Sequence, residues 1–166
     1  MEIIQNYRYY LEIFFEVLLW GALVWQCLED LRHKLLYDSI SFALALGGFA
    51  HSFFFADMSR SLMGGGIAFL CLAFLSLYRG GLGLGDLLLG SALGFWLGPE
   101  LSIMMLILAF VLAAVLCALL WFCHLLERGL AFAPFLTLAT FITKFYGSKI
   151  MELYLTYLAP IAGVFN

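Results

Sequence analysis

The chain has 166 residues, of which 65% are apolar and only 11% are charged, and its formal net charge is −3 at pH 7. A soluble domain usually carries about 25% charged residues, so this chain has too little polar surface to cover a water-facing globule. The negative net charge gives no electrostatic basis for binding nucleic acid. We therefore predict an integral membrane protein whose lipid-facing side chains are apolar.

Six apolar runs approach the length of roughly 20 residues that a helix needs to span a bilayer. We predict an all-α polytopic membrane protein with about six transmembrane helices, in a single domain over residues 1–166. The expected helices are Tyr10–Leu28, Leu36–Ala56, Ser61–Tyr78, Asp86–Gly98, Leu101–Leu125 and Leu130–Tyr146. The tail, Ile150–Phe165, is interrupted by Pro160, and whether it extends the sixth helix, lies in the interface or re-enters the membrane is left open.

Basic residues in the connections give a weak indication of orientation. Successive spans place the first, third and fifth loops on one side, with Arg32, Lys34, Arg79 and Arg128. The opposite side is expected to hold Arg8, Arg60, Lys144 and Lys149. The two sides are tied under the positive-inside rule, although the close spacing of the bases in the first loop favours a cytosolic location for that loop.

Two aspartates are expected at the same membrane face. Asp30 ends the first predicted helix and Asp86 begins the fourth, so three crossings separate them. Asp86 follows the glycine-rich segment Gly80–Gly85. Such a segment allows unusual backbone angles and close approach of another chain. The simpler interpretations are a solvated charge beside the helix for Asp30 and a helix cap for Asp86.

Paired aspartates have a specific chemical use. Two nearby carboxylates do not both ionise easily, so they share one proton and titrate as a pair. The ionised member takes a proton from water, and the protonated member polarises the scissile carbonyl. This chemistry needs no metal or other cofactor, and the four scattered cysteines, which form no CxxC pair, do not indicate a zinc site. We therefore predict a water-accessible cleft with Asp30 and Asp86 as catalytic residues.

Four segments resemble one protease family. Gly83–Asp86 matches the GxGD motif of intramembrane aspartyl proteases, and the longer stretch to Gly98 resembles the corresponding segment of type IV prepilin peptidases. The other similar segments are Asp30–Asp38, the glycine cluster Gly64–Gly66, and Phe132–Leu136, which is similar to the family's FGPFL. They occur in the family's order over about residues 25–140.

This resemblance implies a membrane-embedded aspartic endopeptidase with catalytic Asp30 and Asp86, supported by Gly83, Gly85 and Pro134. It implies cleavage of the basic leader of prepilin-like substrates (pilins or pseudopilins) at the cytosolic face of the bacterial inner membrane. The leader would precede an apolar helix. The resemblance further implies a short form lacking the N-terminal methyltransferase-associated region. The expected partners are such substrates and membrane lipid; the oligomeric state is left open.

The chain departs from the family pattern at three positions. Leu88 replaces a lysine two places after the second aspartate, Tyr37 replaces a proline, and Ala133 replaces the glycine of FGPFL. No departure removes either of the two aspartates. The missing lysine is expected to change either substrate handling or the titration of the aspartates.

Other polar residues in the apolar runs have open roles. Glu12 and Glu16 lie one turn apart on one helix face. Glu16 is interpreted as a substrate contact, as a residue with a polar partner in the bundle, or as an interfacial charge. Asp38 is a second candidate for substrate contact. His51 is predicted to be a packed polar residue.

Three alternatives compete with the peptidase hypothesis. Paired acids in a membrane also serve small transporters or channels that bind ions or relay protons, but such acids are expected deeper than the interface. An inactive family member acting in assembly of a pilus or secretion machine would tolerate loss of both aspartates. Another GxGD protease, such as a preflagellin peptidase, would differ in substrate choice.

Overall fold

The computed structural model describes residues 2–34, 36–55, 57–79, 82–122 and 131–157, and all regular secondary structure within them is helical. The helices are α1 (Glu2–His33), α2 (Asp38–Phe55), α3 (Met58–Arg79), α4 (Leu84–Leu97), α5 (Pro99–Phe122) and α6 (Ala133–Tyr157). The predicted all-α class is confirmed, and each of the six predicted helices has a counterpart.

The helices differ in their capacity to cross a membrane. Four of them, α1, α2, α3 and α5, are long and apolar enough to span a bilayer. Helix α4 is apolar but has only 14 residues. Helix α6 has 25 residues and carries Lys144, Lys149 and Glu152 from its middle onward. The chain is a multi-pass helical membrane protein in which the fourth helix is short, as predicted.

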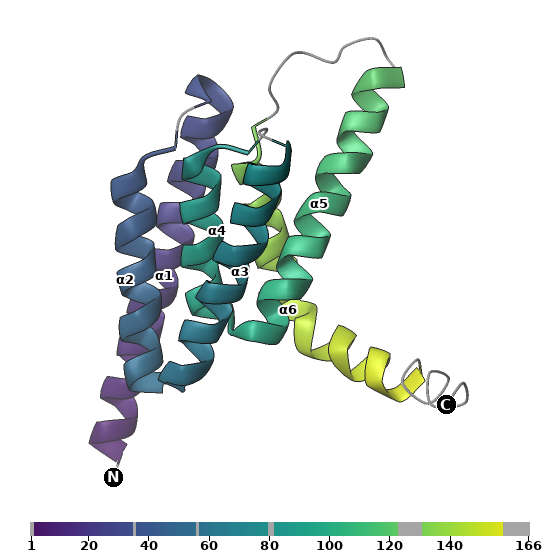
Figure 1. Cartoon of the computed structure of the whole chain (residues 1–166). Coiled ribbons are helices and arrows are strands. Elements are labelled where there is room, and N and C mark those ends of the chain that lie inside the picture. Colours follow the sequence, from purple (N-terminus) through teal and green to yellow (C-terminus); the bar gives the residue numbers. More distant parts are fainter. Residues whose placement is uncertain (1, 35, 56, 80–81, 123–130, 158–166) are drawn as a thin grey trace.

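Helix α4 lies at the centre of the bundle (Figure 1), where it contacts α2, α3, α5 and α6. Helix α1 packs against α2 and α6. The end of α1 and the starts of α2, α4 and α6 lie together at one face of the bundle, which is the upper face in Figure 1. The C-terminal end of α5 and the C-terminal part of α6 extend away from the other helices.

Glycines allow α3 and α4 to approach backbone to backbone. A Cβ on Gly64 would overlap the carbonyl oxygen of Gly94, and a Cβ on Gly94 would lie 2.5 Å from the carbonyl oxygen of Gly64. The predicted role of the third-helix glycines in close packing is therefore confirmed for Gly64. Gly66 differs, because a Cβ there would meet nothing within 4 Å.

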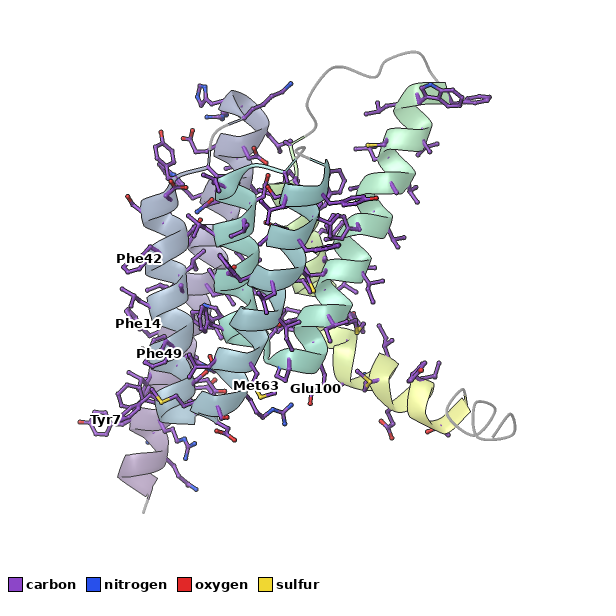
Figure 2. All side chains as sticks on the ribbon, in the orientation of Figure 1. Tyr7, Phe14, Phe42, Phe49, Met63 and Glu100 are labelled. Atoms are coloured by element: carbon purple, nitrogen blue, oxygen red, sulfur yellow. The ribbon has the colours of Figure 1, made fainter. Side chains whose placement is uncertain are left out.

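Large apolar side chains cover the outside of the bundle. Phe14, Phe42 and Met63 point away from the helices in Figure 2 and are exposed. Since the lipid tails supply an apolar solvent, this surface is the expected one for a membrane protein. The buried core instead includes Leu19, Leu72 and other leucines that are fully enclosed.

Two boundary predictions are corrected. Helix α1 continues to His33, through residues expected to form the first loop. Helix α6 continues to Tyr157, so the start of the tail extends the sixth helix, while residues 158–166 lie outside the described part. Lys144, which was predicted near the end of the sixth helix, lies in the middle of α6, and Lys149 also lies inside this helix.

Candidate active site

Asp30 is held near the end of α1 by the start of α6. Its side chain is buried, with 5% of its surface exposed. The Ala133 amide donates a hydrogen bond to Asp30 Oδ2 at 2.9 Å. Ala133 is the first residue of α6, where backbone amides have no partner within the helix and the helix dipole favours negative charge. The arrangement fixes one oxygen of the buried carboxyl group.

Asp86 lies in the first turn of α4. The Gly83 amide donates a hydrogen bond to Asp86 Oδ2 at 3.3 Å. The helix cap anticipated from the sequence is therefore present. Asp86 Oδ1 is buried and has no hydrogen-bond partner among the described residues. One oxygen therefore serves the helix, and the other is left for a further interaction.

The two carboxylates are neighbours in space. The end of α1 and the start of α4, which carry them, lie at the upper face in Figure 1, close enough for the two carboxyl groups to interact electrostatically. Helices α2 and α6 each contact both α1 and α4, which brings two residues far apart in the sequence to one place. The prediction that counting spans puts both acids on one face is confirmed.

The described glycines of the GxGD segment allow another part of the chain to pack closely against α4, and they do not adopt unusual backbone angles. Gly83 has an ordinary extended backbone, with φ −70° and ψ 152°. Among the described glycines only Gly98 has a positive φ. A Cβ on Gly85 would lie 2.7 Å from Leu36 Cβ, so a side chain there would push α4 away from the chain entering α2. The predicted backbone role is wrong for Gly83, and the close approach is confirmed at Gly85.

Gln26 is a site-supporting residue that the sequence interpretation missed. Its side chain is fully buried one turn before Asp30 on α1. The amide nitrogen donates to Ser41 Oγ at 2.9 Å and to the Tyr37 carbonyl at 3.3 Å. These bonds attach the end of α1 to the start of α2. An amide within an apolar run, one turn from an aspartate, was the available signal.

Comparison with protein families agrees with this geometry. The model of the type IV leader peptidase family matches residues 17–119, which is more than half of the chain. The chain belongs to the type IV leader peptidase family. The matched range contains both aspartates and the GxGD segment and ends before Phe132. Neither the comparison with curated proteins nor that with solved structures gives a match.

Membership of the leader peptidase family gives context to the region around Pro134. Pro134 is the second residue of α6, a position at which proline is tolerated because no helical partner exists for its missing amide. Because the helix begins at this point, Pro134 does not kink it. Ala133 contributes its backbone amide, so the family's glycine is replaced without loss of the hydrogen bond to Asp30.

Leu88, which replaces the family lysine, points away from the aspartates. Two residues along a helix correspond to a rotation of about 200°, so Leu88 and Asp86 occupy opposite sides of α4. Leu88 lines an apolar groove between α2 and α3 together with Phe42 and Gly66. Of the two expected effects of the missing lysine, this position favours substrate handling over titration of the carboxylates.

The remaining candidates differ in their distance from the aspartate pair. Asp38 is exposed in the first turn of α2, at the same face as the pair. Glu16 lies about four helical turns before Asp30 on α1. It forms an ion pair with Lys144 at 2.6 Å, so the interpretation of a polar partner in the bundle is confirmed. His51 stacks on Phe55 and Trp96, as expected of a packed polar residue.

Proposed function

We propose that this leader peptidase family member is an aspartic endopeptidase in which Asp30 and Asp86 hydrolyse the bond between leader and mature protein. The substrates are prepilin-like proteins, and cleavage takes place at the cytosolic face of the bacterial inner membrane. The observation that carries the proposal is the juxtaposition of two carboxyl groups, one buried and one with an unpaired oxygen, at a single face of a family-matched bundle.

The chemistry follows from the shared proton. Two neighbouring carboxyl groups avoid double ionisation, so one is protonated while the other is charged. The charged member removes a proton from water, whose oxygen attacks the scissile carbonyl carbon. The protonated member donates to the carbonyl oxygen. The tetrahedral intermediate then collapses as a proton passes to the leaving amine and the carbon–nitrogen bond breaks.

The site's surroundings fit a substrate that enters from the membrane face. Asp38 and Glu29 lie near the catalytic pair on α2 and α1, and Asp38 is exposed. Acidic side chains attract the basic leader that precedes the apolar helix of a prepilin-like protein. We propose Asp38 as a contact for that leader, and the bond to be cut would lie where the leader meets the helix.

The structure gives less support to the transporter hypothesis. That hypothesis requires acids below the interface that are available for ions or protons. The acid farther along the span from the catalytic face, Glu16, is neutralised by Lys144 and accepts a further hydrogen bond from the Trp20 indole at 3.1 Å. The catalytic pair itself lies near helix ends at one face of the bundle, and not in the middle of a span.

The test is cleavage of a purified prepilin-like substrate in detergent by variants that retain side-chain shape. Asp30→Asn and Asp86→Asn are each expected to reduce the rate by at least about 10³-fold, because neither can share the catalytic proton. Asp57→Asn is the matched control. Asp57 lies at the opposite face and accepts a hydrogen bond from the Ser59 amide at the start of α3, as Asp86 accepts one from Gly83.

Asp57→Asn should cleave at the wild-type rate. Normal cleavage by folded Asp30→Asn and Asp86→Asn proteins would contradict the aspartic mechanism. If the wild-type protein cleaves no prepilin-like substrate, yet its deletion prevents pilus or secretion assembly, the inactive-member alternative takes its place.

A further inference from the structure

An ion pair joins α1 and α6 far from the catalytic carboxylates. Lys144 Nζ lies 2.6 Å from Glu16 Oε1, and both side chains are mostly enclosed, with 21% and 32% of their surfaces exposed. Both residues lie inside helices whose outer surfaces are apolar. Ionisable side chains within a membrane are costly unless they are paired, so a retained pair at this depth calls for an explanation.

Aromatic residues from three helices enclose the pair. The Trp20 indole of α1 donates to Glu16 Oε2 at 3.1 Å, and Lys144 Nζ lies 5.6 Å from the centre of the Trp96 ring of α4. Trp96 in turn donates to the Leu44 carbonyl of α2 at 2.8 Å. Phenylalanines of α6 also pack on Trp20. The cluster therefore connects the helices that carry Asp30, Asp86 and the Ala133 amide.

The spacing along α1 and α6 places this cluster on the same sides of the two helices as Asp30 and the Ala133 amide. Lys144 follows Ala133 by about three turns, so both lie on nearly the same side of α6. Glu16 precedes Asp30 by about four turns, and again the two share a side of α1. The α1–α6 interface thus has two polar contacts, Glu16–Lys144 and Asp30–Ala133, about 16–21 Å apart along the axes.

Two polar contacts, separated along the same helix–helix interface, fix both the position of one helix along its axis and its rotation relative to the other helix. Apolar side chains alone fix them poorly in a membrane, because lipid is as favourable a neighbour as another helix. The Asp30–Ala133 hydrogen bond is short-range, so a slide of one residue along α6, about 1.5 Å, would break it.

We infer that Glu16 and Lys144 are positioning residues for catalysis: their ion pair holds α6 at the register in which the Ala133 amide reaches the Asp30 carboxylate. This inference rests on the proposed peptidase function and deepens it. In this inference Glu16 acts by positioning α6, and it does not contact the substrate directly as was considered from the sequence.

The first experiment measures kcat and KM for cleavage of a prepilin-like substrate by purified variants. Lys144→Met removes the charge but keeps an apolar chain of similar length, and it is expected to lower kcat about tenfold with KM within twofold of wild type. Lys144→Arg keeps the pair and should stay within threefold of the wild-type kcat. Glu16→Gln, which weakens the pair from the other side, should resemble Lys144→Met.

Arg60→Met is the matched control. Arg60 and Glu100 form an ion pair of the same length, 2.6 Å, but both side chains are more than half exposed and they join α3 to α5. The Arg60→Met variant should keep the wild-type kcat. A wild-type kcat in folded Lys144→Met protein, or an equal loss in Lys144→Arg, would overturn the inference.

A second measurement does not depend on activity. Spin labels at Leu31 of α1 and Leu138 of α6, which are 58% and 48% exposed, report the α1–α6 distance by electron paramagnetic resonance in a background without the native cysteines. The distance distribution should be narrow in wild type and Lys144→Arg and broader or shifted in Lys144→Met. An unchanged distribution in Lys144→Met would overturn the inference. Absence of any cleavage by wild type would contradict the proposed function alone.

Discussion

Helices α4 and α5 follow each other directly in the chain, and both are strongly apolar, yet they occupy opposite environments. Nine of the 14 residues of α4 are buried, whereas four of the 24 residues of α5 are. Helix α4 is surrounded by four other helices, and α5 leaves the bundle along its C-terminal half. The helix that is shielded from lipid is the one that carries Asp86.

Helices α4 and α5 differ in the size of their side chains more than in polarity. Helix α4 contains Gly90, Ser91, Ala92 and Gly94 close together, whereas the exposed half of α5 is dominated by leucine, valine and aromatic residues. Small residues let helices approach closely when lipid gives no hydrophobic reason to associate. In an apolar chain, runs of small residues therefore distinguish protein-facing helices from lipid-facing ones.

The comparison between buried α4 and lipid-facing α5 is tested most strongly by two truncations, Leu93→Ala and Leu119→Ala. Leu93 in α4 is fully buried, whereas Leu119 in α5 is 57% exposed. Truncation of Leu93 should cost about 2–5 kcal/mol of unfolding free energy through the cavity it leaves. At Leu119 lipid or detergent replaces the lost contacts, so the cost should stay within about 0.5 kcal/mol. Unfolding by SDS titration from a mild detergent measures both. Equal costs would contradict the assignment of α4 as the core helix.

Gly94→Ala against Gly66→Ala tests the helix crossing itself. An added methyl group on Gly94 meets backbone atoms of α3 that cannot move aside. The expected loss of unfolding free energy is about 1–3 kcal/mol. The methyl group on Gly66 meets nothing within 4 Å, and alanine also favours the helix, so stability should hold or rise slightly. The same SDS titration applies, and a stable Gly94→Ala protein would show that α3 and α4 do not approach so closely.

Leu88→Lys should have the smallest effect. Leu88 lines the groove between α2 and α3 on the side of α4 opposite Asp86. Restoring the family lysine should therefore leave the pH dependence of kcat unchanged and keep kcat within threefold of wild type, with the larger change in KM. A shift in the pH profile would show that position 88 acts on the carboxylate pair.

Much of the fold was accessible from the sequence for physical reasons. Apolar length predicts spans because unsatisfied backbone groups are excluded from lipid. Counting crossings then placed Asp30 and Asp86 at the same face without any knowledge of packing. The resemblance of the GxGD segment led to the family that the comparison confirms over residues 17–119.

The contacts that complete the site were not accessible in the same way. The donor to Asp30 is a backbone amide 103 residues away, and a backbone group leaves no signature in the residue type. Helix α6 was expected to end near Tyr146, which assigned Lys144 to the boundary instead of the interior. Its pairing with Glu16 was thereby missed, although two opposite charges within apolar runs were the available signal.

The shortness of α4 has a consequence for the interior of the bundle. The helix has only 14 residues. At this length it spans about 21 Å, while the hydrocarbon core of a bilayer is about 30 Å thick. A lipid-facing helix of this length would force the bilayer to thin around it. Helix α4 is instead enclosed by α2, α3, α5 and α6, all of them longer, so its neighbours and not the lipid cover the difference. The enclosure therefore lets the first turn of α4, with Asp86, end below the level of the headgroups without deforming the membrane.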